Sequence, residues 1–432
     1  MDVDDARDLL QRVSHALGAL KSRGNLLGAI AWSRDVEEGF FGAKCAKLPA
    51  PTYAIDHDAL TDESRRLEEL ASSIEGDEPI PTYLRAAVRS AVDRNRLLLS
   101  VETKAFGDAS REIYGGARTS YWGAPAGSQC PRNVDLADHL LARLQVQGWD
   151  EAQDEAPEKL TAQQLAAELE TRIQAHRPKI DVDVILDERC TSKAIAGMTR
   201  VRIRPDATFE PWEAKGLYVH EVETHAFTAQ NGAAQELAPF LKAGGPRSTA
   251  TQEGLAVFAE LHNHTLATPR LERLAIRVKM VEMAEDGASF LDLFRWLVER
   301  GASQRDAYLD ATRIFRGGLV AGGAPFTKDA CYLAGLLHVY AFLSTFVRAG
   351  FRDEVEMIVA GRIALDDVIA LAELRNMGLL SRPKHRPRWL ERWSTLLPYF
   401  AFASFMDEVN LAPIEAHYQG LSRLASTARP TR

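Results

Sequence analysis

The residues best suited to chemistry are two histidines and a glutamate near the middle of the chain. His220 and His225 carry imidazoles, and Glu221 directly follows the first of them. Imidazole nitrogens are common zinc ligands, and zinc lowers the pKa of a bound water to about 7. A neighbouring glutamate can accept the proton of such a water. The segment therefore predicts a hydrolytic zinc site with Glu221 as the general base.

The spacing of the two histidines differs from the common H-E-x-x-H motif, in which they lie four residues apart on one helix face. His220 and His225 are five residues apart. In a regular α-helix, five steps of about 100° turn the second side chain about 140° away from the first. A π-type turn between Val222 and His225 would absorb the extra residue. Without a third ligand, two histidines that share a helix by chance explain the pattern equally well.

Glu253 offers a third ligand, in the sequence Gln252-Glu253-Gly254-Leu255-Ala256. Catalytic zinc sites commonly combine two His and one Glu and leave a fourth position open. The pattern from Thr251 to Leu266 predicts a second helix with Glu253 in its first turn, 28 residues after His225. Taken alone, Glu253 would be explained as a carboxylate that complements the helix macrodipole.

These segments resemble the QEGLA-motif family of metallopeptidases (DUF1704), which includes microtubule-associated tyrosine carboxypeptidases and bacterial proteins described as flavohaemoglobin expression modulators. The resemblance covers residues 180 to 390. It includes the histidine segment, Asn231-Gly232, Gln252 to Ala256, Pro269-Arg270-Leu271, Arg313, Arg316-Gly317-Gly318, Phe326 to Asp329, Tyr332-Leu333 and Gly335. It implies that His220, His225 and Glu253 bind zinc and that Glu221 is the general base. Nothing in the sequence identifies tubulin as the substrate.

Three cationic residues bear on whether a peptide is cut at its end or within its chain. A carboxypeptidase must bind a free α-carboxylate, which Arg does with two parallel charge-assisted hydrogen bonds. Arg316 and Lys328 are the leading candidates for this role, and Arg313 is a third. Alternatively, Arg313 or Lys328 pairs with Asp329 or Asp310 and only fixes the loop.

Two further residues are candidates for supporting roles. Tyr332 lies one helical turn after Lys328 and could donate a hydrogen bond to the oxyanion of the tetrahedral intermediate. Its phenol could equally satisfy a buried carbonyl. Glu260 lies seven residues after Glu253, on nearly the same helix face, and could orient a metal-binding imidazole through the free N–H of that ring.

The elements that must position these residues are mostly helical. The pattern predicts a mainly α, α+β fold with a small antiparallel β-sheet beside the metal helix. With the H-E-x-x-x-H segment on that helix, the resemblance to metallopeptidases implies a fold of the zincin-like type. Its strands are expected where apolar and polar residues alternate, at 180–186 and 200–204. Met198 to Arg204 is the candidate edge for extended substrate, although its arginines could instead form a solvated face that discourages aggregation. We expect a helical N-terminal extension at 1–155 and a catalytic domain at 156–432.

Composition and charge favour a soluble enzyme over a nucleic-acid-binding or membrane protein. The 432 residues are 46% hydrophobic and carry a formal net charge of -8, without the basic stripe typical of nucleic-acid binders. The longest apolar stretch, Leu333 to Val347, is too short to span a membrane. Four separated cysteines, and a start without a basic, apolar leader, predict a reduced cytoplasmic protein.

Together these features predict a zinc-dependent peptidase, specifically a carboxypeptidase that acts on protein or peptide C-termini. Two alternatives stay open. One is an endopeptidase or aminopeptidase that uses the same site. The other is a non-catalytic, zinc-stabilised protein that regulates or interacts with other proteins without turnover.

Overall fold

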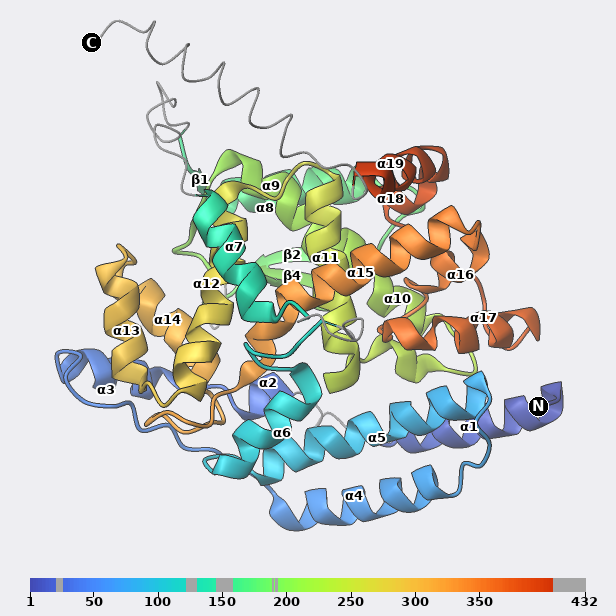
Figure 1. The fold of residues 1–432 in the computed structure, drawn as a ribbon, viewed down its shortest axis with the longest axis horizontal. Helices are drawn as coiled ribbons and strands as arrows, with labels where there is room; N and C mark the ends of the chain where they lie inside the picture. The colour runs from blue at the N-terminus through green and yellow to red at the C-terminus, as the bar shows by residue number, and fades with distance from the viewer. Residues whose placement is uncertain (21–25, 122–129, 145–157, 189, 191–192, 407–432) are drawn as a thin grey trace, which may run out of the picture.

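The computed structural model describes residues 1–432 except 21–25, 122–129, 145–157, 189, 191–192 and 407–432. Helices dominate, and two small sheets lie among them (Figure 1). The predicted class, mainly α with a small sheet, agrees with this architecture. The predicted domain boundary at residue 155 falls within 145–157 and lies outside the described residues.

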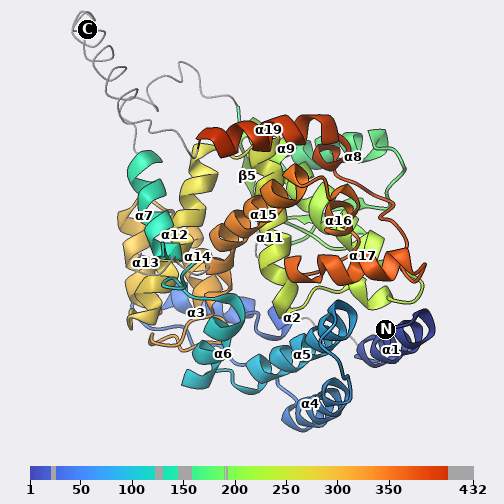
Figure 2. The ribbon, with the colours of Figure 1, turned by 45° about the vertical axis from the view of Figure 1, so that its right-hand side comes forward.

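The named elements of the described N-terminal region, up to residue 144, are all helices. They are α1 (Val3–Gly18), α2 (Leu26–Ala29), α3 (Arg34–Gly42), α4 (His57–Ser72), α5 (Pro79–Leu99), α6 (Lys104–Tyr114) and α7 (Asn133–Leu144). In both views α4 and α5 lie along one side of the molecule (Figures 1 and 2). Leu10 and Leu84, from α1 and α5, belong to the same buried apolar cluster as Val222 and Phe258. The N-terminal helices therefore share a core with the segments that carry the predicted site.

Two small sheets precede the histidine segment. The strands are β1 (Leu160–Thr161), β2 (Asp183–Leu186), β3 (Ala194–Ala196), β4 (Arg200–Ile203) and β5 (Thr208–Phe209), with α8 (Ala162–Ala175) after β1. β1 pairs antiparallel with β5, and the other sheet has the order β2-β4-β3. β4 is antiparallel to β3 but parallel to β2. The prediction of a purely antiparallel sheet was therefore wrong.

The parallel pair arises because β3, a strand that the alternation pattern missed, lies between β2 and β4 along the chain. β3 turns back into β4 as a hairpin, and β2 pairs with the opposite side of β4. β4 is thus the central strand, and the prediction that Met198 to Arg204 forms a free edge was wrong. The alternation within β4 is as expected, since Val201 and Ile203 are buried between exposed arginines.

The histidine segment is the middle of one continuous helical stretch. A short helix, α9 (Pro211–Leu217), leads into a π-helix, η3 (Tyr218–Ala226), which leads into α10 (Phe227–Ala233). The π-type turn predicted between Val222 and His225 is confirmed, and the π-helix is longer than a single turn. Because a π-helix bonds residue i to residue i+5, side chains five residues apart come onto one face.

Two helices cross at the centre of the molecule (Figure 1). They are α11 (Thr249–His262) and α15 (Cys331–Arg348), the latter preceded by a 3-10 turn, η6 (Thr327–Ala330). Gly254 and Gly335 lie at the crossing, where a Cβ on Gly254 would be 2.3 Å from the carbonyl carbon of Gly335. Only glycine permits so close an approach of two backbones.

The other helices surround this central pair. They are η4 (Pro239–Lys242), η5 (Pro246–Ser248), α12 (Thr268–Glu285), α13 (Phe290–Glu299), α14 (Gln304–Phe315), α16 (Arg352–Met357), η7 (Leu365–Asp367), α17 (Val368–Asn376), α18 (Arg388–Glu391) and α19 (Trp393–Met406). None of the four cysteines forms a disulfide.

One helical stretch in the described part of the chain, Thr327–Arg348, is long and apolar enough to cross a membrane by length and composition. It is longer than the apolar run seen in the sequence because η6 continues directly into α15. Of its most apolar window, 44% is buried, and α15 packs against α7, α11, α16 and α19. A central core helix of a folded protein passes the same test.

Candidate metal centre and active site

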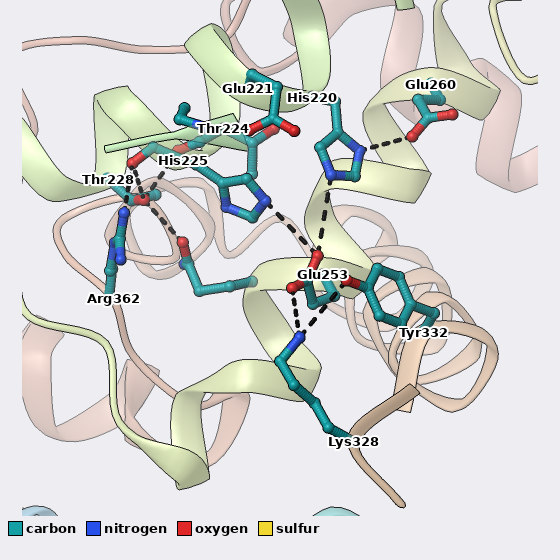
Figure 3. A network of polar contacts seen from close by, with 12 residues as sticks. His220, Glu221, Thr224, His225, Thr228, Glu253, Glu260, Lys328, Tyr332 and Arg362 are labelled. Atoms are coloured by element: carbon teal, nitrogen blue, oxygen red, sulfur yellow. Dashed lines mark hydrogen bonds and ion pairs between the residues drawn. The ribbon is translucent and has the colours of Figure 1, made fainter. Parts of the chain in front are cut away.

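Three donor side chains from two helices converge in the interior (Figure 3). Nε2 of His225 lies 3.6 Å from Oε2 of Glu253, and Nε2 of His220 lies 3.9 Å from the same oxygen. One ligand atom from each residue lies within 4.8 Å of the other two. A tetrahedral zinc ion with bonds of about 2.0–2.1 Å separates its ligand atoms by about 3.3 Å. The donor set therefore fits a metal ion of this kind after small side-chain shifts.

Glu260 fixes the ring of His220 from behind. Its Oε1 lies 2.6 Å from Nδ1 of His220, and Arg270 donates to both oxygens of the same carboxylate. Burial alone would raise the pKa of Glu260, but Arg270 and His220 outweigh it and lower the pKa to about 2. An ionised carboxylate only accepts, so Nδ1 carries the proton and the Nε2 lone pair faces Glu253.

Glu221 lies beside the three donors but is held by a different element. The backbone N–H of Ala196, in the edge strand β3, donates to Oε2 of Glu221 at 2.7 Å. The side chain is buried, and its neighbour in sequence, His220, is a member of the donor cluster. One carboxylate oxygen is thus anchored to the sheet, which leaves the other to act on a substrate or water.

Lys328 and Tyr332 approach Glu253 from the side away from the two imidazoles (Figure 3). Nζ of Lys328 lies 2.9 Å from Oε1 of Glu253 and 3.5 Å from the Tyr332 hydroxyl. Burial would lower the pKa of Lys328, but the charge of Glu253 outweighs it and raises the pKa. Burial, followed by the charge of Glu253, raises the pKa of Tyr332. The site therefore places a permanent cation and a protonated phenol beside the donor cluster.

The other two predicted cations differ sharply from each other. Arg313 donates to both oxygens of Asp329, at 2.6 and 2.8 Å, as the structural alternative anticipated. Arg316 has no carboxylate partner among the described residues, and its guanidinium lies 5.5 Å from the centre of the Phe326 ring. Burial and the charge of Arg313 lower the pKa of Arg316 to about 10. Arg313 is therefore paired with a carboxylate, whereas Arg316 contacts an aromatic ring and pairs with no carboxylate among the described residues.

The structure also brings residues to the site that the sequence did not indicate. The Gln252 side chain accepts from the hydroxyl of Thr228 at 2.8 Å and so ties α11 to α10. Nη2 of Arg362 lies 3.4 Å from the carbonyl oxygen of His225. Gln252 was inside a recognised motif, but Arg362 lies 137 residues from His225 in a turn without one. The spacing of residues along the sequence gives no indication of Arg362.

Two histidines and a carboxylate converging beside a second carboxylate form the kind of site with which hydrolases activate water. A family model described as "Microtubule-associated tyrosine carboxypeptidase" matches residues 38–408. The chain belongs to this family, which confirms the resemblance seen in its sequence. It is accordingly a hydrolase with carboxypeptidase-like peptidase activity.

Comparisons with curated proteins and with solved structures do not extend the family assignment. No curated protein matches the chain. Among solved structures, one titled the "putative lipoprotein from Colwellia psychrerythraea" has 13% sequence identity, with a TM-score of 0.43 over 75% of this chain and 69% of the other. That likeness is too weak to support an argument about fold or function.

Proposed function

We propose that the chain is a zinc-dependent carboxypeptidase that removes residues from protein or peptide C-termini. The observation that carries the proposal is the convergence of His220, His225 and Glu253, with ligand atoms within 4.8 Å of one another, next to the carboxylate of Glu221. Membership of the tyrosine carboxypeptidase family supports the choice of a C-terminal substrate. We place the activity in the cytoplasm, with neither nucleic acid nor membrane as a partner.

His220, His225 and Glu253 would hold the ion, which when bound supplies a water of lowered pKa and an electrophile for the substrate carbonyl. Glu221 accepts the proton of the attacking water and later delivers it to the departing amine. Because the Ala196 N–H holds Oε2 of Glu221, the remaining oxygen is the base. Glu260 keeps the Nε2 lone pair of His220 directed at the donor cluster.

Tyr332 is the residue that we assign to the oxyanion. Its raised pKa keeps the phenol protonated at neutral pH, so the hydroxyl can donate to a developing negative charge. Lys328 is 3.5 Å from that hydroxyl and orients it.

Lys328 also balances the charge of Glu253, so its role is in the catalytic centre and not in binding a distant carboxylate. Of the three cations predicted to bind substrate, Arg316 alone lacks a carboxylate partner among the described residues.

The proposal is tested with a library of peptides that carry free or amidated C-termini. Products of the wild type and of Glu221→Gln are identified by mass spectrometry, and bound metal is measured for both. We expect the wild type to release residues from free C-termini only. Glu221→Gln should retain the metal, while its rate of hydrolysis falls roughly 10²- to 10⁴-fold. The control Glu236→Gln, at an exposed position, should retain both the metal and the wild-type rate.

Each alternative predicts a different pattern in the same experiment. Equal cleavage of free and amidated peptides, at internal bonds, would show an endopeptidase. Release of N-terminal residues would show an aminopeptidase. Absence of any cleavage by a metal-loaded wild type would favour the non-catalytic regulatory protein and contradict the proposal.

A further inference from the structure

Arg362 lies behind the histidine side of the candidate metal centre. It belongs to the turn between α16 and η7, where its backbone N–H donates to the carbonyl of Leu241 at 2.8 Å. Its side chain passes over Gly244, where a Cβ would be 3.3 Å from Cδ of Arg362. The guanidinium ends 3.4 Å from the carbonyl oxygen of His225 (Figure 3). Arg362 thus reaches the site from the side of His225, opposite to Lys328 and Tyr332.

The guanidinium of Arg362 is only partly satisfied by hydrogen bonds within the described protein. Its Nε is buried and makes no hydrogen bond, and its contact with the His225 carbonyl is at the long end of the hydrogen-bond range. In the described part of the chain, no carboxylate forms an ion pair with it. An arginine offers five N–H donors, and a buried donor without a partner, as at Nε of Arg362, is costly. Arg313, by contrast, is satisfied by both oxygens of Asp329.

The charges that act on Arg362 include the carboxylates of the site itself. Burial lowers the pKa of Arg362, and the groups that oppose this are Glu253 and Glu221. Neither carboxylate forms an ion pair with Arg362, so the guanidinium lies beside the centre, against the backbone of His225, without being bound to either carboxylate. A metal ion on Glu253 would offset the negative charge of that carboxylate, which leaves the arginine available for an anion from outside.

Arg316, the other arginine without a carboxylate partner, is less well placed. Its guanidinium lies over the Phe326 ring, and the charges that act on it most are Arg313 and Asp329, followed by Tyr332 and Tyr114. Among these groups, Tyr114 belongs to α6 and Arg313 to α14. An anion bound there would also meet the charges of Arg313 and Asp329, whereas Arg362 contacts the backbone of His225, one of the donor residues.

We propose that Arg362 receives the free α-carboxylate of the substrate and thereby selects C-terminal over internal peptide bonds. The planar guanidinium would replace its single long contact with two parallel bonds to the carboxylate oxygens. This inference rests on the proposed carboxypeptidase function, and it assigns to Arg362 the role that the sequence suggested for Arg313, Arg316 or Lys328.

The test separates binding from turnover. In a Glu221→Gln background, calorimetry measures the dissociation constants of one peptide with a free and with an amidated C-terminus. Adding Arg362→Met should weaken binding of the free peptide by roughly 10- to 100-fold, the range expected for hydrogen bonds to a charged group. Binding of the amidated peptide should hardly change. Arg362→Lys, which keeps the charge but not the fork, should recover part of the preference.

The second measurement is of kcat and KM for peptide hydrolysis. In the wild-type background, Arg362→Met should raise KM for the free peptide more than it lowers kcat, because the contact is with the bound carboxylate and not with the reacting carbonyl. Arg316→Met tests the competing assignment, in which Arg316 binds the carboxylate. Arg352→Met is the control for the loss of an exposed guanidinium. Bound metal and melting temperature are measured for each variant, and if Arg362→Met does not fold, Arg362→Lys carries the test.

The outcomes distinguish this inference from the proposed function. If Arg362 variants keep the preference for a free terminus, or if Arg316→Met abolishes it, the assignment of Arg362 is overturned. If the preference depends on Arg362 but the wild type hydrolyses no peptide, the carboxylate site stands and the proposed peptidase activity fails. If free and amidated peptides bind equally to the Glu221→Gln protein, both are contradicted.

Discussion

The two ring nitrogens of His220 make different interactions at the candidate centre. Nδ1 is held by Glu260 at 2.6 Å, so that Nε2 is left to face Glu253 and His225. Burial disfavours the charged form of His220, but Glu260 outweighs it and raises the pKa above the ordinary value. The carboxylate therefore makes the ring more basic as well as fixing its orientation, and both effects favour a bound cation.

Glu260→Gln should weaken metal binding without removing a ligand. The amide can still accept from Nδ1 of His220, but it lacks the negative charge, so we expect zinc affinity to fall roughly 10- to 100-fold. Competition with a chromophoric chelator measures this directly. An unchanged affinity would show that Glu260 only packs against the ring.

Some of these residues could be assigned from the sequence, and others could not. The types and order of His220, Glu221 and His225 indicated a metal site, and the seven-residue interval from Glu253 pointed to Glu260. The contact between Ala196 and Glu221 had no sequence signal, because a backbone N–H is available at almost every position. Arg362 was missed for a related reason, since tertiary folding alone brings its turn to the histidines.

At the scale of elements, two features allow the donors to meet. The π-helix η3 turns His220 and His225 onto one face, with their ring centres 5.0 Å apart. The close crossing of α11 and α15 then brings Glu253, Lys328 and Tyr332 together, because Gly254 lets the backbone of Gly335 approach. The glycine of the QEGLA motif thus positions the neighbouring glutamate by its lack of a side chain.

Gly254→Ala should separate these two helices and disturb the site. The new methyl group would lie 2.3 Å from the Gly335 carbonyl, and relieving such a clash typically costs about 1–3 kcal/mol. We expect a lower free energy of unfolding in urea and a large loss of peptidase activity.

Gly39→Ala provides the matched control. Gly39 lies in α3, and nothing is within 4 Å of its missing Cβ. Alanine is favoured over glycine in a helix by up to about 1 kcal/mol, so this variant should be as stable as the wild type or more so. Equal effects of the two substitutions would contradict the role given to the crossing.

The elements themselves were predicted unevenly. The histidine spacing required a π-turn, and the helix that carries Glu253 followed from its apolar pattern. The topology of the sheet was not accessible in the same way, since β3 is only three residues long and lacks a distinctive alternation. Because β3 was not predicted, the sheet was expected to be antiparallel when it is mixed, and the free edge was assigned to β4, which is the central strand.

At the scale of the whole molecule, the C-terminal region is tied to the helical stretch that carries the histidines. Asn231, in α10, donates to the carbonyls of Val359 and His385 and accepts from the His385 N–H. His385 is buried, and its ring packs near Phe227. This part of the protein therefore depends on a neutral imidazole in the interior.

The stability of the metal-free protein should consequently fall in mild acid. Burial, together with the charges of Lys384 and His176, lowers the pKa of His385 to about 4, below the value of about 6.5 for an unfolded chain. Its contribution is complete above pH 6.5 and is lost as the pH falls toward 4, because the unfolded state takes up the proton first. Between pH 7 and 5 the loss amounts to about 2 kcal/mol.

Urea unfolding of the wild type and of His385→Phe, at both pH values and with a chelator present, measures this contribution. The variant keeps an aromatic ring but cannot be protonated, so its loss of stability over that interval should be smaller by about 2 kcal/mol. Parallel pH profiles for the two proteins would exclude His385 as the source.

The central claim is that His220, His225 and Glu253 bind the ion on which hydrolysis depends, and titration of the metal-free protein with zinc tests it most directly. Release of the C-terminal residue is followed after each addition, for the wild type and for His225→Ala. We predict no hydrolysis without metal, a linear rise that ends near one equivalent of zinc, and no recovery in the variant. Full hydrolysis by the metal-free protein, or full recovery of the variant at one equivalent, would contradict the account.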